Sequence, residues 1–405
     1  MIEPIIAFSK DWHEDPTSNH HVLRELARTR RVLWLNSIAT RRPSMASARD
    51  RSKILRKLTE VSRGAVHVEN DLWIATPIVL PLPGNAVATA INQRIVRWTI
   101  AALRAQLGIE RFHLWTFLPN TGDYVGTLGE DLSVYYCVDE WSTFSNLDAA
   151  ATARAERKLL ERVDVTFATS RALVGAKRAV CPHTYHAPHG VNHAQFARAL
   201  DDATAIPADL AALPGPRIGF FGTLRDFIDL DLIAEVARAR PAWSFALLGQ
   251  QLCDVSMFRD LPNVHLLGQK PHEQLPAYCR GFDVGLIPYR IDDRVRYVNP
   301  LKLREYLSAG VPVVATPMPE VLPLSHLCRV AGSAEETVAA IEATLREGNA
   351  PATRRARSES MAGETWVGRV REITRAIDEL DLDKHARDRV VQEWRLTGTT
   401  VRIAP

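Results

Sequence analysis

Lys302 and Glu305 have the chemistry and the spacing of a site for a phosphate and a ribose. The residues around them predict a helix that begins here, because Asn299 can cap its N-terminus and Pro300 suits its first turn. Lys302 then lies in the first turn, where free backbone N–H groups and the helix dipole attract an anion. Glu305 lies one turn deeper on the same face, and its carboxylate can accept two hydrogen bonds from a ribose diol. The alternative is an ordinary helix with a Lys–Glu pair three residues apart.

A helix followed by a buried strand must hold these two side chains in place. Gly310 predicts the end of the helix, and the apolar run VPVVAT that follows it predicts a buried strand. Short apolar runs alternate with amphipathic stretches through most of the chain, which is the pattern of a parallel sheet covered by helices. The predicted strands are Ile5–Phe8, Val32–Asn36, Ala65–Val68, Leu72–Ala75, Phe112–Thr116, Val134–Val138, Val163–Ala168, Arg217–Phe221, Ser244–Leu248, Val264–Leu267, Val284–Ile287 and Pro312–Ala315. The predicted helices are Asn19–Thr29, Ala86–Leu107, Ala149–Arg162, Leu230–Arg240, Gln274–Arg280, Leu301–Ala309 and a tail from Pro351 to Leu382.

Two α/β units follow each other along the chain. The first ends near Pro182–Phe196, where two prolines and a glycine break the periodicity, and the second begins after Pro214–Pro216. We expect a Rossmann-like domain over residues 1–190, a second one over 191–362 and a C-terminal helical segment over 363–405.

The composition is that of an ordinary globular protein. Of 405 residues, 46% are hydrophobic and 24% charged, with a formal net charge of +3, which argues against disorder and against a nucleic acid partner. No run approaches the ~20 apolar residues that span a bilayer, and the N-terminus lacks the basic and apolar regions of a secretory signal. The five cysteines are far apart and include no CxxC pair, which argues against disulfides and a cysteine zinc site. We therefore expect a cytoplasmic α/β protein.

The segment from Asn299 to Thr316 resembles the donor-binding motif of the retaining family 4 glycosyltransferases (glycosyltransferase group 1), which have the GT-B fold. It matches the form P-x-K-x-x-E-y-l-a-x-G-x-P-V-V-a-t. Many members carry an earlier glutamate eight residues before the one that matches Glu305, and here that position is Tyr297. The resemblance implies two Rossmann-like doubly wound domains that face each other across a cleft, with C-terminal helices that return to the first domain. It implies a catalytic role for Lys302 and a donor-binding role for four other residues: Asn299, Pro300, Leu301 and Glu305.

The resemblance continues in the segment that opens the second domain. Gly219–Arg225 is similar to the family's first strand and glycine loop. Gly222 and Thr223 would let backbone amides approach the diphosphate of the donor, and Arg225 would clamp it with two hydrogen bonds and so act in catalysis. The family often places a lysine a few residues further on, where this chain has Asp226 and Asp229.

Two later segments also match the family. Leu261–Gln269 is similar to the strand that leads to the nucleotide base, so the donor site would include Gly268 and Gln269, with Lys270 beside them. Asp283–Tyr289 matches the strand before the donor loop. Two arginines of that loop, Arg294 and Arg296, would lie near the site and could assist phosphate binding. The alternative is that they are solvated.

The first domain supplies candidate residues for the acceptor. Asn19 or its neighbour Ser18 can cap a helix at the place where family members have a glycine-rich loop. His20 or His21 would then face the cleft, and a solvated helix N-terminus is the alternative. Asp139 follows a predicted strand, and ligands of open α/β sheets bind at the carboxyl ends of the strands. The family places a catalytic histidine or aspartate near this position, and Trp141 beside it could stack on a sugar or pack in the core.

Four histidines near the domain boundary do not form a familiar zinc pattern, because prolines and a glycine keep them off a single helix face. They are His183, His186, His189 and His193. The resemblance instead places this segment at the crossover between domains. We expect no metal site and no cofactor.

The segment Arg41–Arg63 is basic and amphipathic, with eight basic residues, two acids and apolar side chains at helical spacing. Such a segment can lie on an anionic membrane surface, at the inner face of the membrane. A solvated insertion is the alternative.

Taken together, the resemblance implies an enzyme that transfers a sugar from a nucleoside diphosphate sugar to a hydroxyl group. The transfer would retain the configuration of the anomeric carbon and need no metal. The acceptor would be a glycan or lipid-linked saccharide in the assembly of a bacterial cell-surface polysaccharide. Two alternatives are a nucleotide-sugar epimerase of similar architecture and a non-catalytic nucleotide-sugar-binding partner.

Overall fold

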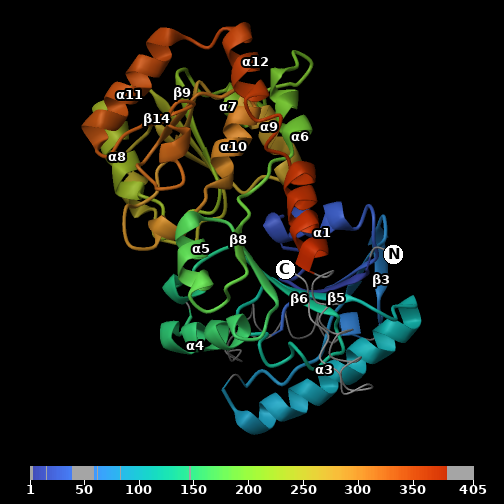
Figure 1. Ribbon diagram of the computed structural model, residues 1–405. Coiled ribbons are helices and arrows are strands. Elements are labelled where there is room, and N and C mark those ends of the chain that lie inside the picture. The colour runs from blue at the N-terminus through green and yellow to red at the C-terminus, as the bar shows by residue number, and fades with distance from the viewer. Residues whose placement is uncertain are drawn as a thin grey trace, which may run out of the picture.

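The computed structural model describes residues 3–14, 16–38, 59–61, 63–82, 84–145 and 147–380. They form two α/β domains, one above the other in Figure 1, and each domain is built on one sheet. The predicted α/β class and the two Rossmann-like units are therefore confirmed. The residue numbers at which we divided the domains remain predictions.

The first sheet has eight strands in the order β3-β4-β2-β1-β5-β6-β7-β8, all parallel except the edge strand β3. Its strands are β1 (Ile5–Phe8), β2 (Val32–Leu35), β3 (Val66–Glu69), β4 (Leu72–Ala75), β5 (His113–Thr116), β6 (Leu132–Cys137), β7 (Val165–Ala168) and β8 (Thr184–His186). The helices of this domain are α1 (Ser18–Leu26), α3 (Ala86–Leu107), the 3-10 turn η1 (Trp141–Thr143), α4 (Ala149–Leu160) and α5 (Arg171–Arg178).

Successive side chains of the first sheet pack into two separate cores, as alternation along a strand requires. In β1, Ile5 and Ala7 join α1 and the last helix on one face, whereas Ile6 and Phe8 join α3, α4 and α5 on the other. Both cores lie within this domain. The sequence analysis did not predict the short strand β8 or the helix α5.

The second sheet has six parallel strands in the order β11-β10-β9-β12-β13-β14. Its strands are β9 (Arg217–Phe221), β10 (Ser244–Leu248), β11 (Val264–Gly268), β12 (Val284–Ile287), β13 (Val313–Ala315) and β14 (Arg329–Val330). The helices are α6 (His193–Ala197), α7 (Ala208–Ala211), α8 (Leu230–Ala239), α9 (Leu275–Arg280), α10 (Leu301–Ser308), α11 (Ala334–Glu347) and α12 (Pro351–Glu359). The 3-10 turns are η2 (Arg198–Leu200), η3 (Ser256–Phe258), η4 (His272–Gln274), η5 (Val295–Tyr297) and η6 (Leu322–Leu324).

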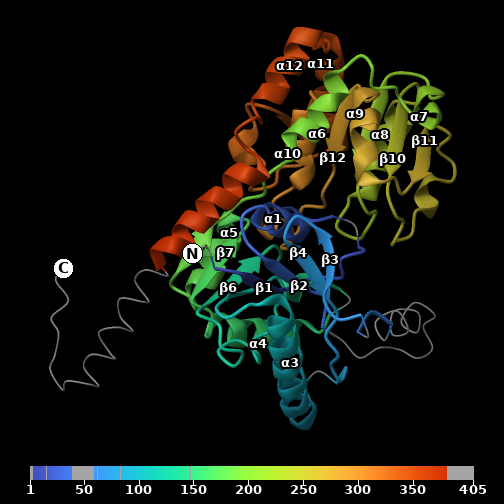
Figure 2. The same ribbon diagram turned by 90° about the vertical axis from the view of Figure 1, so that its right-hand side faces the viewer.

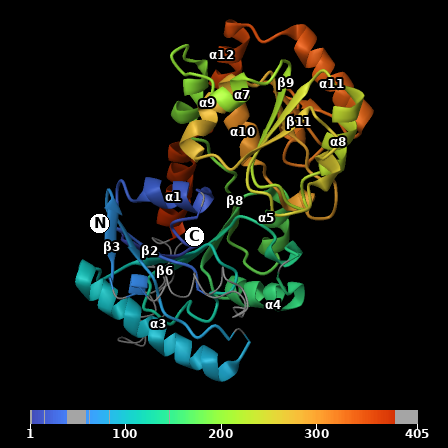
Figure 3. The ribbon, with the colours of Figure 1, turned by 180° about the vertical axis from the view of Figure 1, so that it is seen from behind.

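The chain crosses between the domains twice, and the two crossings lie side by side. The backbone N–H of Val191 donates to the carbonyl of Glu364 at 2.8 Å. A Cβ on Gly190 would lie 2.6 Å from the backbone nitrogen of Trp366, so only glycine allows this close approach. After the second crossing, residues 366–380 form a helix that packs on the first domain beside α1, as Figures 1 and 3 show.

This return of the C-terminal helix confirms the expected architecture, and Trp366 is 5% exposed on its apolar face. The tail is not one helix from Pro351, however. It breaks over residues 360–365, where the chain crosses between the domains.

Candidate functional site

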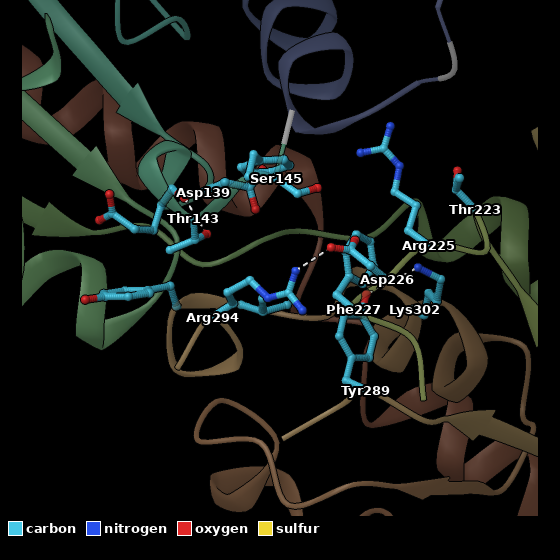
Figure 4. Close-up of a pocket in the computed structure, with 14 residues that line it drawn as sticks. Asp139, Thr143, Ser145, Thr223, Arg225, Asp226, Phe227, Tyr289, Arg294 and Lys302 are labelled. Carbon is cyan, nitrogen blue, oxygen red and sulfur yellow. Dashed lines mark hydrogen bonds and ion pairs between the residues drawn. The ribbon is translucent and has the colours of Figure 1, made fainter. Parts of the chain in front are cut away.

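A cavity of about 320 Å³ lies between the two domains, at the carboxyl ends of strands from both sheets. Figure 4 shows Asp139, Thr143 and Ser145 of the first domain on one side, and Thr223, Arg225 and Lys302 of the second domain on the other. Five of the candidate residues singled out from the sequence thus line one cavity: Asp139, Thr223, Arg225, Arg294 and Lys302.

Lys302 lies in the first turn of α10, and its ammonium group is held over two aromatic rings. Its Nζ lies 5.8 Å from the ring centres of Phe220 and Tyr289 and 3.5 Å from the Tyr289 hydroxyl. No carboxylate in the described part of the chain forms an ion pair with Lys302. A positive charge placed on aromatic faces, with no acid beside it, is available to an anion.

The place of Lys302 depends on Gly222, which follows β9. A Cβ at this position would lie 2.2 Å from Cε of Lys302, and the Gly222 φ is +134°, a conformation that other residues rarely adopt. Gly249, which follows β10, packs directly against Gly222. A Cβ added at Gly249 would lie 2.0 Å from the carbonyl oxygen of Gly222. The sequence analysis did not single out Gly249, because this contact joins two strands.

Arg225 and Arg294 both line the cavity, but they differ in charge balance. The Arg225 side chain is half-buried and has no acidic partner among the described residues. Arg294 forms 2.7 Å ion pairs with Asp226 and Asp292, and the hydrogen bonds that it donates to Asp292 raise its pKa. Figure 4 shows the pair with Asp226. The charge of Arg294 is therefore balanced by these two acids, and its contact with the phosphates stays a prediction.

Arg296, Lys270 and Gln269 do not line the cavity. Arg296 stacks on and donates to Tyr297, and Lys270 forms a 2.8 Å ion pair with Asp209. Gln269 is exposed on the loop after β11, next to Gly268. Tyr297, at the position of the family's additional glutamate, lines the cavity and packs against the core of the first domain.

Glu305 is 5% exposed on α10 and is bound by a histidine that the sequence analysis did not identify. Nε2 of His272 lies 3.0 Å from Oε1 of Glu305, and the amide of Gln195 lies 3.2 Å from Nδ1 of the same ring. Because the amide donates to Nδ1, the neutral ring carries its proton on Nε2 and donates it to the carboxylate. His272 follows the loop after β11, so it links the expected base loop to the expected ribose-binding carboxylate.

Asn299 connects the domains and does not cap α10. Its amide donates to the carbonyl of Thr169 at 2.8 Å, and its oxygen accepts from Arg304 at 2.8 Å. The N-cap residue is Pro300, which has no side chain to satisfy the first N–H groups. The capping prediction was therefore wrong. The N–H of Leu303 donates to the Pro300 carbonyl at 3.2 Å, and no capping side chain of the described residues holds the N–H groups of Leu301 and Lys302. Leu301 packs against the core of the first domain.

Two neighbouring acids in the first domain have different surroundings. The carboxylate of Asp139 has no hydrogen-bond partner among the described residues, and burial raises its pKa to about 6. Glu140 accepts from the Lys177 ammonium at 2.7 Å, and the same ammonium binds Glu156 at 2.7 Å. Burial alone would raise the pKa of Glu140, but Lys177 holds it below its ordinary value. Asp139 is therefore the carboxylate of this pair that is available to a ligand.

The three residues expected on the acceptor side lie away from the lining of the cavity. Asn19 is buried and donates to the Ser9 hydroxyl. Trp141 stacks on Phe144, which does line the cavity, at 5.6 Å between ring centres.

His20 is buried in the first domain, so of the two histidines expected at the cleft, His20 and His21, it is not the one that meets the second domain. Its ring packs against Trp12 and Trp34, with ring centres 5.2 and 4.8 Å away, and its Nε2 bonds the Trp12 carbonyl at 3.0 Å. Burial lowers its pKa to about 4. Its Nδ1 accepts from the backbone N–H of Thr17, the actual N-cap residue of α1, so the expected cap at Ser18 or Asn19 was also wrong.

His21, the next residue, is the histidine of α1 that meets the second domain. It stacks on Trp366 at 5.0 Å, lies 6.0 Å from His272, and burial lowers its pKa to about 3.

Among the described residues, no three His, Cys, Asp or Glu side chains are grouped as metal ligands, and no helix is long and apolar enough to cross a membrane. The five cysteines are free thiols.

Comparison with known proteins places these features in a wider context. Residues 215–347 match the family Glycosyl transferases group 1. TuaH of Bacillus subtilis, named for teichuronic acid biosynthesis as a glycosyltransferase, is 29% identical over 230 residues. The match covers 52% of this chain and 56% of TuaH, so it spans only about half of that relative.

Two solved structures are similar over almost the whole chain. Sucrose-phosphate synthase from Thermosynechococcus elongatus has a TM-score of 0.65 at 15% identity and covers 93% of this chain and 99% of its own. Anabaena HepE in complex with UDP-glucose has a TM-score of 0.64 at 13% identity, with the same coverage. The chain therefore has the GT-B fold of these structures, and its second domain contains the segment that matches the glycosyl transferases group 1 family.

Proposed function

We propose that the protein is a glycosyltransferase that moves a sugar from a nucleoside diphosphate sugar to a hydroxyl acceptor. The observation that carries the proposal is the pair Arg225 and Lys302, two cations without acidic partners among the described residues, in one interdomain cavity opposite Asp139. The group 1 match of the second domain and the fold shared with a UDP-glucose complex favour this function over an epimerase or a non-catalytic binder.

The donor diphosphate would lie at the carboxyl edge of the second sheet. Negative charge develops on this leaving group, so Arg225, Lys302 and the uncapped N–H groups at the start of α10 would stabilise the transition state more than the ground state. The ribose would bind Glu305, whose carboxylate His272 already orients. The base would lie toward Gly268 and Gln269.

Retention at the anomeric carbon would follow from attack on the face from which the diphosphate leaves. The departing phosphate oxygen would take the proton of the acceptor hydroxyl. Asp139 would hold a hydroxyl of the sugar or acceptor from the opposite wall of the cavity, and closure of the domains would exclude water. Metal independence has support in Arg225 and Lys302, because these cations would neutralise the diphosphate as a metal does in other transferases.

The acceptor would be a saccharide or lipid-linked saccharide in cell-surface polysaccharide assembly, which the relation to TuaH supports. The enzyme would then work in the cytoplasm at the inner membrane face. The segment Arg41–Arg63, which we interpreted as a membrane contact, lies mostly outside the described residues.

The first test is a thermal-shift screen of the full chain against UDP-, GDP-, TDP- and ADP-sugars, which should raise the melting temperature for one base. The product formed with that donor should carry the donor's anomeric configuration by NMR, at an unchanged rate in EDTA. An inverted product or loss of rate in EDTA would contradict the finer parts of the proposal. No shift with any donor, together with no transfer, would refute the function itself.

A further inference from the structure

The outward face of α3 is apolar, although surface helices normally turn polar residues to water. Trp98 is 77% exposed, Val87 70% and Ile91 39%. These positions are four and seven residues apart, so they form one stripe along the helix. The opposite face, which includes Val96 and Ile100, is buried in the core of the first domain. This helix is therefore apolar on both faces.

The loop before α3 extends the apolar surface. Ile78, Leu80 and Leu82 are each about 40% exposed, at 44%, 39% and 41%. Asn92 of α3 bonds both the N–H and the carbonyl of Leu80, at 2.6 and 3.0 Å, so the loop is attached to the helix. Figures 1 and 2 show α3 on the outer side of the first domain, away from the second domain. The surface formed by residues 78–82 and 84–105 of this loop and helix is here called the α3 surface.

The charges of the α3 surface all have one sign. The sequence has no aspartate or glutamate between Asp71 and Glu110. Arg94 and Arg97 are exposed on the outward side of the helix, and Arg97 makes one long bond to a backbone carbonyl. Such a surface complements an anionic partner, whereas a two-fold contact between copies of this chain would bring arginines together without acids to pair them.

We propose that the α3 surface binds an anionic phospholipid surface. Val87, Ile91 and Trp98 would insert among the headgroups, and Arg94 and Arg97 would pair with lipid phosphates. Tryptophan is suited to this position, because its ring is apolar and its N–H can stay hydrated. The proposal adds a membrane contact to the proposed function, and it does not need the segment Arg41–Arg63.

The test is co-sedimentation of the full chain, without nucleotide sugar, with vesicles of phosphatidylcholine alone or mixed with phosphatidylglycerol. We expect binding to the anionic vesicles that decreases with salt. Replacing Arg94 and Arg97 by glutamine should lower the partition coefficient about 30-fold, because each basic residue near such a surface contributes about a factor of five. The substitutions Ile91→Glu and Trp98→Glu together should abolish binding.

A matched control is Leu322→Glu, which places the same charge on an apolar side chain that is 49% exposed on the second domain. It should leave vesicle binding unchanged, and thermal unfolding should show that all variants fold. Equal binding of wild type and the Ile91/Trp98 variant would overturn the proposal. So would a dimer in sedimentation that this variant dissociates, because the face would then belong to a second copy. Since no substrate is present, failure here leaves the proposed transfer reaction untouched.

Discussion

Replacing Asp139 by asparagine is expected to stabilise the folded protein at alkaline pH while it lowers the rate of sugar transfer. Burial raises the pKa of this carboxyl from 3.8 to about 6. A difference of one pKa unit between the folded and unfolded states corresponds to about 1.4 kcal/mol. Keeping the ionised carboxylate in the fold therefore costs up to about 3 kcal/mol at pH 8. The uncharged asparagine avoids this cost.

The pH dependence gives the sign of the effect. The folded state binds the Asp139 proton more tightly than the unfolded state, so the wild type loses stability as the pH rises from about 4 through about 6. The gain in unfolding free energy for Asp139→Asn should therefore grow from about 1.5 kcal/mol at pH 5 to about 3 kcal/mol at pH 8. Urea unfolding of both proteins at the two pH values measures it.

Glu140 provides the matched control, because Lys177 holds its pKa below the ordinary value. Glu140→Gln should destabilise the fold at both pH values, which is the opposite sign. In activity, kcat/KM of the wild type should rise through pH 6 as Asp139 ionises, and the Asp139→Asn profile should lack this rise. A variant that is less stable than wild type at pH 8, or a difference that does not grow between pH 5 and 8, would refute the reasoning.

Three further substitutions separate the parts of the donor site. Lys302→Ala should lower the affinity for nucleoside diphosphate and for inorganic diphosphate about 10- to 100-fold, as measured by calorimetry, because it removes a charged hydrogen bond. Lys158→Ala, on the surface, should leave both affinities unchanged. Gly222→Ala should displace Lys302 and lower the affinity by a similar factor. The double variant should bind no worse than Lys302→Ala alone, and additive losses would contradict the contact between Gly222 and Lys302. His272→Ala should release Glu305 and lower the affinity for nucleoside diphosphate, while the affinity for inorganic diphosphate stays unchanged. Equal losses for both ligands would show that His272 does not act through the ribose carboxylate.

The sequence was sufficient to predict the parts of the site that depend on local structure. The positions of Lys302 and Gly222 could be predicted because each depends on neighbouring residues in the chain. Lys302 lies in the first turn of a helix, and Gly222 lies in the turn directly after a strand. The directions of side chains at longer range were not predictable in this way. His20 lies in the core because Trp12 and Trp34 pack against it, and part of the charge of Arg294 is balanced by Asp226, 68 residues away.

The residues that support the site were missed for the same reason. His272 acquires its importance only when its loop meets α10, and Lys177 only when α5 packs beside Glu140 and Glu156. None of these contacts has a signal in residue spacing. The α3 surface did have one: the helix was predicted correctly, but its exposed face becomes unusual only once the buried face is known.

The paired crossings at Val191 and Glu364 have a consequence for the entropy of donor binding. A single flexible connection would let one domain twist and tilt freely relative to the other, and a ligand between them would have to order every one of those motions. Two adjacent chain segments joined by a backbone hydrogen bond resist twisting of one domain against the other. The main motion that remains is opening and closing of the two domains about these crossings. Binding then restricts a single angle, and less of the interaction energy is spent on ordering the protein.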